Sequence, residues 1–230
     1  MRKIETAELV KHRLFLASPQ YGGQCASIFA RSLSDLAYLC GRYGVLLDTC
    51  FYTNESLVTR ARNYCADQFL RSPANHMIFI DADIGFQAQD VMELMILQIQ
   101  HPEYEIIGGA YPRKALGAGM CVNWDGEIDV KSTEPIEVTG IGTGFMMLTR
   151  GVFQKMDVMY PEFKYITDDP NPPYSGREIM QYFQAEIDPV SRRYLSEDYW
   201  FSKKCRTIFW QAEWLRMYSG ARPPGITRAT

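Results

Sequence analysis

The chain has 230 residues, of which 47% are hydrophobic and 22% charged, and its formal net charge is −3. This length suits one domain with a sizeable core, and the composition is far from that of a disordered chain. The acidic balance lacks the basic excess that is typical of a nucleic-acid-binding protein. The charged N-terminus has no apolar segment like that of a signal peptide, and no apolar run is long enough to span a membrane. We therefore expect a cytoplasmic protein.

Six cysteines are scattered along the chain and form no C-x-x-C pair. This pattern is typical of neither a disulfide framework nor a zinc site. We expect reduced thiols that lie mostly in the core, in keeping with a cytosolic protein.

Short apolar runs alternate with helical patterns through the first half of the chain. The residues Ser18–Gly23 after the first run are rich in turn formers, and Gly44 ends the first long helical pattern. Alternating strands and helices predict an α/β fold with a parallel sheet covered by helices. The predicted strands are Arg13–Ala17, Val45–Phe51, His76–Ile80 and Glu105–Gly108, and the predicted helices are Ser27–Tyr43, Asn54–Leu70 and Asp90–Gln100.

The second half of the chain has a different pattern. Ile136–Thr149 is rich in β-forming residues and glycine, whereas Thr167–Arg177 is dense in Pro, Gly, Asp and Asn. We expect Thr167–Arg177 to be a loop, either a lid or acceptor-binding element or a disordered segment. A further helix is predicted after Leu195, with Ser196 as its N-cap and Tyr199 at its third position.

The apolar run His76–Ile80 leads into two carboxylates, Asp81 and Asp83, separated by Ala82. A continuous apolar run is typical of a strand buried on both faces, and ligands of open α/β sheets bind beyond the carboxyl ends of such strands. Two acids there suit Mg²⁺ or Mn²⁺, which take one or two carboxylates and complete their shell with water and phosphate oxygens. The alternative interpretation is a solvated turn after a strand.

On the predicted helix Asn54–Leu70, the residues Glu55, Thr59, Arg62 and Asn63 form a polar stripe at spacings of three and four. Arg62 is suited to donate to a phosphate or to a metal-binding carboxylate. The alternative is a solvated helical face on which Glu55 and Arg62 have no partner.

Two adjacent acids, Glu197 and Asp198, stand at the start of the last predicted helix. In this position acids either favour the helix dipole or accept the proton of an attacking hydroxyl. A glycosyl transfer that inverts the anomeric centre needs such a base opposite the leaving group.

Two further segments contain closely spaced glycines. Gly108–Lys114 follows a predicted strand, and its residues Tyr111, Arg113 and Lys114 are candidates to hold a donor sugar or an acceptor. Gly140–Phe145 has glycines at alternate positions, but it lacks the helix that a phosphate-binding G-x-G-x-x-G motif must open. We therefore do not interpret it as a phosphate loop.

Taken in chain order, these segments resemble the A-type glycosyltransferases, the nucleotide-diphospho-sugar transferases with the GT-A fold, and most of all their small viral and bacteriophage members. The resemblance spans residues 12–220 and rests on the joint order of the motifs. The motifs are Ser18-Pro19, Thr59–Asn63, Phe79–Asp83, Gly108–Lys114, Gly142–Leu148 and Tyr194–Phe201.

The resemblance implies a Rossmann-like, mostly parallel central sheet flanked by helices, with a smaller acceptor-side region of strands and loops. A single domain would occupy residues 1–230, with a nucleotide-sugar-binding half at 12–115 and an acceptor-side half at 116–220. For a viral protein, the implied location is the cytoplasm of the host cell.

The resemblance also implies roles for individual residues. Asp83 would bind the metal directly, Asp81 the metal or the ribose, and Glu197 or Asp198 would be the base, with Asp198 favoured. The implied cofactor is Mn²⁺ or Mg²⁺, the donor a UDP-sugar, and the acceptor a glycan, a small molecule or a modified nucleobase. The residues expected to bind the nucleotide sugar are Ser18, Pro19, Tyr21, Arg62, Asp81, Ala82, Asp83, Tyr111, Lys114 and Gly144.

One position departs from the family pattern. Relatives often end with a metal-binding histidine two residues before a glycine, and in the corresponding segment Trp214–Gly220 this position is Tyr218. A neutral phenol is a poor ligand for Mg²⁺ or Mn²⁺. Either the metal is held by Asp83, phosphates and water alone, or the chain is catalytically impaired.

Three other functions share part of this pattern. A phosphatase of the haloacid dehalogenase type also places D-x-D after a strand, but Gly85 stands where Thr or Val is usual, and Asp168-Asp169 lies in a Pro-rich loop. A nucleotidyltransferase needs a basic, Gly-rich loop, and Ser18–Gly23 contains no Arg or Lys. A non-catalytic binder of a sugar nucleotide or glycan is favoured by Tyr218.

Overall fold

A seven-stranded sheet forms the centre of the computed structural model, which describes residues 3–113, 119–127, 132, 134–169, 173–208, 215–218 and 227–228. Its strands, in spatial order, are β2 (Leu46–Thr53), β1 (Arg13–Gln20), β3 (His76–Ile80), β9 (Phe145–Thr149), β5 (Ile106–Gly109), β14 (Leu215–Tyr218) and β7 (Ile136–Glu137). β1, β2, β3, β5 and β14 share one direction, while β9 and β7 run antiparallel to their neighbours. The expected α/β fold with a mostly parallel sheet is confirmed.

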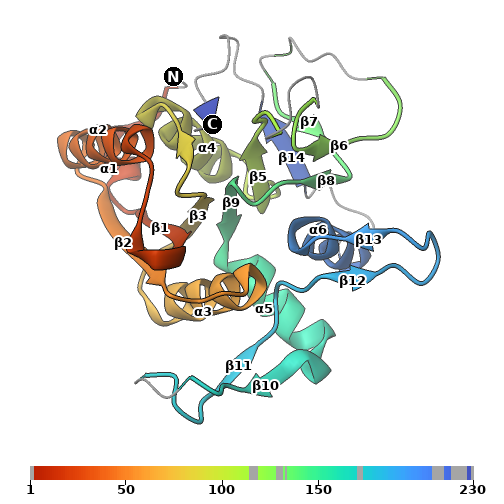
Figure 1. Cartoon of the computed structure of the whole chain (residues 1–230). Coiled ribbons are helices and arrows are strands. Elements are labelled where there is room, and N and C mark those ends of the chain that lie inside the picture. The colour runs from red at the N-terminus through yellow and green to blue at the C-terminus, as the bar shows by residue number, and fades with distance from the viewer. Residues whose placement is uncertain are drawn as a thin grey trace.

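Helices cover both faces of this sheet (Figure 1). One face carries α2 (Ser27–Tyr43) and α4 (Ala88–Gln100), and the other carries α3 (Val58–Arg71), α5 (Arg150–Met159) and α6 (Glu197–Ile208). The central strand β3 contributes to both cores, since Met77 and Phe79 pack on one side and Ile78 and Ile80 on the other. Burial on both faces explains why this strand is apolar throughout.

The end of α2 shows how the sequence sets an element boundary. Gly44 follows the helix with φ of 72°, the left-handed conformation that glycine adopts without a Cβ penalty. Its N–H group donates to the carbonyls of Cys40 and Gly41, which closes the last turn. The predicted boundaries of this helix are confirmed at both ends.

Five elements differ from their predicted bounds: the ends of β2, α4 and β5 are displaced by one or two residues, and α3 and β1 differ by more. α3 starts at Val58 rather than Asn54, because Asn54 has φ of 63° and the carboxylate of Glu55 accepts the N–H of Leu57 at 2.9 Å. Placing Glu55 on the helix was therefore wrong. β1 continues to Gln20 and so includes Pro19, which a strand tolerates here because the pairing with β3 has already ended.

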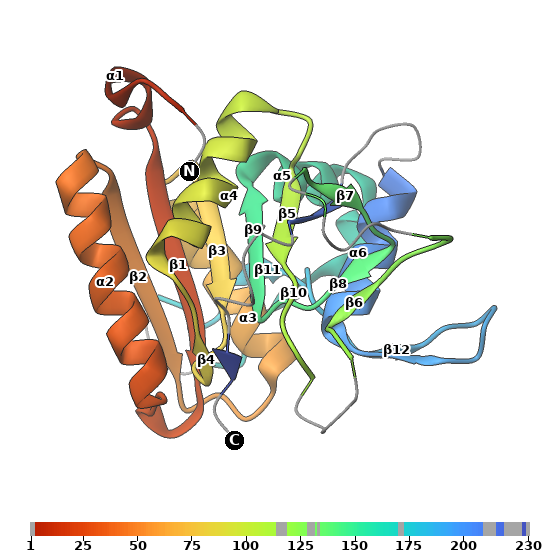
Figure 2. The same ribbon diagram turned by 90° about the horizontal axis from the view of Figure 1, so that it is seen from above.

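Short strand pairs lie around the central sheet. In Figure 1 the β12–β13 hairpin runs beside α6, and in Figure 2 the C-terminal strand β15 lies next to β4, just beyond the end of β3. The pairs are β4 (Ile84–Gly85) with β15 (Thr227–Arg228), β6 (Val122–Asn123) with β8 (Gly140–Ile141), β10 (Lys164–Ile166) with β11 (Glu178–Met180), and β12 (Glu186–Ile187) with β13 (Tyr194–Leu195). The other short elements are α1 (Thr6–Leu9), η1 (Tyr21–Gly23) and η2 (Pro161–Phe163).

The described part of the predicted loop Thr167–Arg177 is tied to α3. Tyr174 is 3% exposed, and its ring centroid lies 4.4 Å from that of Tyr64. The hydroxyl of Thr167 donates to the carbonyl of Tyr174, which closes the turn on itself. Residues 170–172 lie outside the described part, and the role of the loop stays a prediction.

Two predictions from composition concern the whole chain. Four of the six free cysteines are buried, namely Cys40, Cys50, Cys65 and Cys205, which confirms that most thiols lie in the core. Among the described residues, no helix has the length and apolar character that crossing a bilayer requires.

Candidate active site

The turn after β3 is fixed by backbone hydrogen bonds to two distant segments. The N–H of Asp81 donates to the carbonyl of Gly144 at 3.1 Å, and the carbonyl of Ala82 accepts the N–H of Ala26 at 2.8 Å. The structure therefore gives Ala82 a role in holding the start of α2. Asp81 and Asp83 are both half-buried at the carboxyl edge of the sheet, where ligands of such folds bind.

Arg62 on α3 joins this turn to the start of α6. Its guanidinium donates from Nη2 to Oδ1 of Asp81 at 2.8 Å and from Nε to Oε1 of Glu197 at 3.2 Å. Burial alone lowers the pKa of Arg62, but the carboxylates of Asp81 and Glu197 outweigh it and hold the pKa above its ordinary value. Arg62 thus donates to a carboxylate of the D-x-D turn, and the metal-binding role of that carboxylate stays a prediction. The alternative of a solvated helical face is wrong.

One nitrogen of Arg62 has a different environment from the other two. Arg62 is 3% exposed, and its Nη1 is buried with no hydrogen-bond partner in the described part of the chain. A buried cationic donor without an acceptor is costly, and an anionic ligand oxygen is the partner that best satisfies it. Nη1 is therefore a candidate contact for a phosphate.

Asp198, the second residue of α6, accepts two hydrogen bonds at Oδ1. One comes from the hydroxyl of Ser196 and the other from the backbone N–H of Tyr199 at 2.8 Å. Burial, together with the neighbouring charge of Glu197, raises the pKa of Asp198 above its ordinary value, although both hydrogen bonds and the charge of Arg62 act in the opposite direction. A carboxylate with a raised pKa is a better proton acceptor near neutral pH.

The predicted start of α6 is confirmed, but its first N–H groups are satisfied differently. The carbonyl of Ser196 accepts the N–H of Trp200 at 2.8 Å, as expected of the residue before the helix. Its hydroxyl, however, donates to Asp198, and Asp198 accepts the N–H of Tyr199. Sequence analysis missed this link, although a serine two residues before an acid at a helix start is the signal that indicates it.

Alternate glycines before β9 leave room for the phenol of Tyr111. A Cβ on Gly142 would lie 2.2 Å from Oη of Tyr111, and a Cβ on Gly144 would lie 2.6 Å from Oη and 2.9 Å from Oδ2 of Asp81. The N–H of Gly144 donates to Oη of Tyr111 at 2.9 Å. Burial, with the charges of Asp81 and Asp198 adding to it, raises the pKa of Tyr111, so its hydroxyl stays neutral. Tyr111 and Gly144 therefore lie beside Asp81.

Other predicted nucleotide contacts lie along the end of β1 and beyond it. Ser18 is fully buried, and its hydroxyl has no hydrogen-bond partner among the described residues. Tyr21 is 76% exposed in η1, and Pro19 lies within β1. A nucleotide can reach Tyr21 directly, but it reaches Ser18 only if the surroundings of Ser18 move. Lys114 lies outside the described residues.

The oxygen ligands at this edge limit the kind of metal site that can form. Within the described residues, no three side chains of His, Cys, Asp or Glu are grouped so as to hold a metal ion. One oxygen of Asp81 is bonded to Arg62, and Tyr218 ends β14 opposite Gly109 of β5. These residues fit a cation that takes one or two carboxylates and completes its shell with phosphate and water, and they do not fit an all-protein cage.

The acidic pair that a haloacid dehalogenase mechanism would need lies in other contacts. Asp168 accepts from Nη1 of Arg60 at 3.2 Å, and Asp169 accepts from the hydroxyl of Tyr52 at 2.9 Å. The acid that reaches Arg62 is instead Glu197. The late acidic pair of the phosphatase interpretation is therefore engaged elsewhere.

Comparisons with known proteins bear on the fold. No protein-family model and no curated protein matches the sequence. Among solved structures, the protein A197 from STIV is similar with a TM-score of 0.55 and 17% identity, over 90% of this chain and 82% of that chain. S. aureus TarS 1-349 in complex with UDP-GlcNAc is similar with a TM-score of 0.51 and 11% identity, over 95% of this chain and 58% of that chain.

These similarities are structural, since the identities are low. Together with the sheet order and the helices on both faces, they confirm the GT-A type fold that the order of the motifs implied. The chain therefore has the fold of nucleotide-sugar glycosyltransferases of the A type. What the chain does with this fold depends on its own site residues.

Proposed function

We propose that this protein is a glycosyltransferase that moves a sugar from a nucleotide-diphosphate donor to an acceptor hydroxyl. The observation that carries the proposal is the buried Arg62, which bridges Asp81 of the D-x-D turn and Glu197 beside the candidate base. In the proposed site, this bridge would join the donor end, at the D-x-D turn, to the acceptor end, at the start of α6. Nη1 of Arg62, which is buried and has no hydrogen-bond partner among the described residues, would suit a diphosphate oxygen that reaches it.

The expected donor is a UDP-sugar. The TarS structure that contains UDP-GlcNAc supports this choice, because its fold matches over 95% of this chain. Tyr21 is exposed at the end of β1 and is available to the nucleotide, while Gly144 and Tyr111 lie beside Asp81 where the sugar diphosphate would pass.

Asp198 is the proposed base, and the proposed outcome is inversion. Its Oδ1 is held by Ser196 and Tyr199, which leaves Oδ2 to accept the proton of the acceptor hydroxyl. The acceptor oxygen then bonds to the anomeric carbon on the face opposite the departing nucleoside diphosphate. Glu197 is less suitable, because its carboxylate is 15% exposed and paired with Arg62.

Asp83, with the second oxygen of Asp81, is the proposed ligand set for Mn²⁺ or Mg²⁺. A bound cation would stabilise the charge on the leaving diphosphate. Because the described residues offer few ligands, we propose that the metal binds tightly only together with the phosphates of the donor.

A thermal-shift screen of nucleotide sugars tests the proposed function. A donor at a hundredfold its Kd should raise Tm by about 5 to 10 °C with Mn²⁺, and chelator should remove the shift. Asp83→Ala should lose the metal-dependent part, while Asp168→Ala, which changes an exposed acid paired with Arg60, should keep it.

Two results would contradict parts of this proposal. The absence of any shift across the donor panel would count against the function itself, and an unchanged Mn²⁺-dependent shift in Asp83→Ala would count against the metal ligand. For the stereochemistry, an NMR spectrum of the product that shows a retained anomer would exclude Asp198 as an inverting base.

A further inference from the structure

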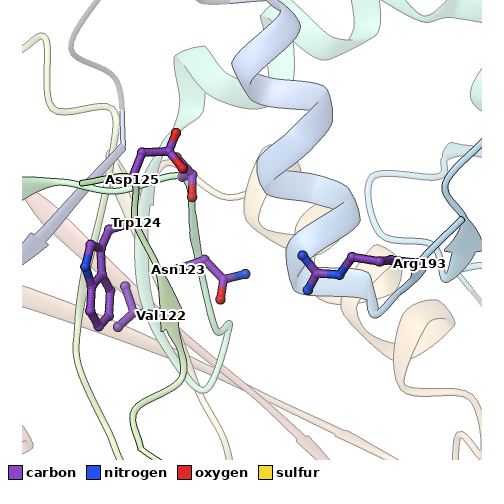
Figure 3. A pocket seen from close by; sticks show the side chains of 6 residues that line it. Val122, Asn123, Trp124, Asp125 and Arg193 are labelled. Carbon is purple, nitrogen blue, oxygen red and sulfur yellow. The ribbon is translucent and has the colours of Figure 1, made fainter. Parts of the chain in front are cut away.

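A polar pocket lies close to the first turn of α6, apart from the residues assigned to the donor. Its volume is about 370 Å³, within the range of small-ligand sites. Figure 3 shows the side chains of Asn123 and Arg193 pointing toward one another across it. The pocket is lined by Val122, Asn123, Trp124, Asp125, Thr139 and Arg193.

Gly140 and Tyr199 connect this pocket to the proposed base. A Cβ on Gly140 would lie 2.7 Å from Cδ1 of Tyr199 and 3.8 Å from Nδ2 of Asn123, so both side chains flank the same glycine. Tyr199 directly follows Asp198 in α6. The N–H of Thr139 donates to the carbonyl of Asn123 at 2.8 Å, which holds this wall of the pocket together. The pocket therefore lies beside Gly140, against which the side chain of the residue after Asp198 packs.

Arg193 supplies a positive charge to the pocket. It is exposed at the start of β13, and no acid of the described residues forms an ion pair with its guanidinium. The acid that also lines the pocket, Asp125, lies 3.6 Å from Arg206. Opposite Arg193 stands the neutral amide of Asn123, which offers both donors and an acceptor. This combination fits a ligand with one anionic group and several hydroxyls.

We propose that the pocket binds the acceptor, and that the acceptor is a saccharide carrying a carboxylate or phosphate group. The inference rests on the proposed glycosyltransferase function and names the substrate class of the same site. Arg193 binds the anion through parallel N–H donors, and Asn123 and Thr139 bind hydroxyls. A nucleic acid fits less well, because a polyanion needs several cationic groups, and the described lining of this pocket combines the guanidinium of Arg193 with the carboxylate of Asp125.

The test uses small probes and the full chain without donor. D-Glucuronate, glucose 6-phosphate and uncharged glucose are titrated separately and followed by NMR, and the two anionic probes distinguish a carboxylate from a phosphate. At least one anionic sugar should bind about tenfold more tightly than glucose, which is the gain expected from a charge-assisted hydrogen bond. Arg193→Gln should reduce this binding to the level of glucose. Arg192→Gln, an exposed neighbour that does not line the pocket, should leave it unchanged.

Two results would overturn the inference: equal binding of all three sugars, or anionic binding that Arg193→Gln leaves unchanged. Tighter, Arg193-dependent binding of a short DNA duplex would overturn it in favour of a nucleic-acid acceptor. The donor-dependent thermal shift is measured on the same samples. A donor shift without Arg193-dependent sugar binding overturns only the acceptor inference. Arg193-dependent sugar binding without any donor shift contradicts the glycosyltransferase function and the acceptor role, and leaves a pocket that binds an anionic saccharide.

Discussion

A guanidinium that is 3% exposed has lost most of its hydration, so Arg62 is stable in its position because two carboxylates replace the water. In turn, the positive charge of Arg62 stabilises the negative charges of Asp81 and Glu197. Their side chains are 22% and 15% exposed, so their charges are only partly screened by solvent. At the scale of single residues, the stability of this three-way contact therefore depends on one charged group, the guanidinium of Arg62.

Arg62→Met removes this cation while keeping much of the apolar stem. We expect the free energy of unfolding to fall by about 3 to 5 kcal/mol, because two partly buried carboxylates lose their partner. Urea denaturation measures the loss. Arg31→Met is the control, since Arg31 is exposed on α2 and its replacement should change the free energy of unfolding by about 0.5 kcal/mol or less. Similar losses in the free energy of unfolding of both variants would show that the bridge contributes no more to stability than an exposed arginine does.

Ser196 acts on Asp198 rather than on the substrate. The hydroxyl of Ser196 favours the charged carboxylate, so Ser196→Ala should raise the pKa of Asp198 further above its ordinary value. Because protonated Asp198 cannot act as a base, the acidic limb of the kcat/KM profile should move to higher pH. Ser196→Thr keeps the hydroxyl and should keep the profile. A ¹³C NMR titration of the Asp198 carboxyl checks the pKa directly, and a pKa that falls or stays constant in Ser196→Ala would refute the positioning role.

At the scale of elements, the segment just before β9 can lie close to Tyr111 only because its residues at the contact are glycines. Gly142→Ala would place a Cβ 2.2 Å from Oη of Tyr111, so the phenol must move away from Gly144 and Asp81. We expect a loss of about 1 to 3 kcal/mol in the free energy of unfolding, as for other overpacked cores, and weaker donor binding. Gly41→Ala in α2 is the control, because its Cβ meets nothing within 4 Å, and it should stabilise the helix by about 0.5 to 1 kcal/mol. Equal stability changes in the two variants would contradict this explanation.

Elements with strong local signals were predictable from the sequence. The predicted bounds of His76–Ile80 and Ser27–Tyr43 agree with β3 and α2 residue for residue, because an unbroken apolar run and a helix-ending glycine are local properties. The start of α3 was missed because the side chain of Glu55 bonds to the backbone at Leu57, which competes with helix formation there.

Contacts between distant elements were not predictable in this way. The pair of Arg62 and Glu197 is separated by 135 residues, and no spacing in the sequence encodes it. The same holds for Arg150 on α5, whose guanidinium donates to backbone carbonyls in the last turn of α3 and in the segment just after it. These carbonyls belong to Phe69, Leu70, Ser72 and Ala74. The candidate residues of the site could therefore be predicted from the sequence. The contacts that orient them could be identified only from the folded structure.

At the scale of the whole molecule, the two predicted halves share one sheet. β9 belongs to the acceptor-side half, yet it lies between β3 and β5 of the nucleotide-sugar-binding half. The backbone bond from Asp81 to Gly144 and the side-chain bond from Arg62 to Glu197 also cross between the halves. Because the site is assembled across this shared sheet, its geometry depends on the stability of the whole domain.

At the edge of the sheet opposite the candidate site, a buried histidine makes the stability of the domain depend on pH. His76 begins β3, is 4% exposed, and contacts Gln98 at 2.8 Å and His12 at 2.9 Å through its two ring nitrogens. Burial lowers the pKa of His76 from 6.5 to about 4, with the charge of His12 adding to the effect and the hydrogen bond to Gln98 opposing it. The unfolded chain therefore binds a proton more readily than the folded chain between these two values.

The stabilisation from neutral His76 should be fully present above pH 6.5 and be lost as the pH falls toward 4. Its size is on the order of 3 kcal/mol, since each unit of pKa corresponds to about 1.4 kcal/mol. Urea denaturation at pH 7 and at pH 4.5 measures the loss. His76→Gln cannot take up this proton, so it should show a smaller loss than the unmodified chain even if its stability at pH 7 is lower. His101→Gln, which changes an exposed ring stacked on Tyr104, should retain the full loss. An equal loss in His76→Gln would show that groups other than His76 cause the acid sensitivity.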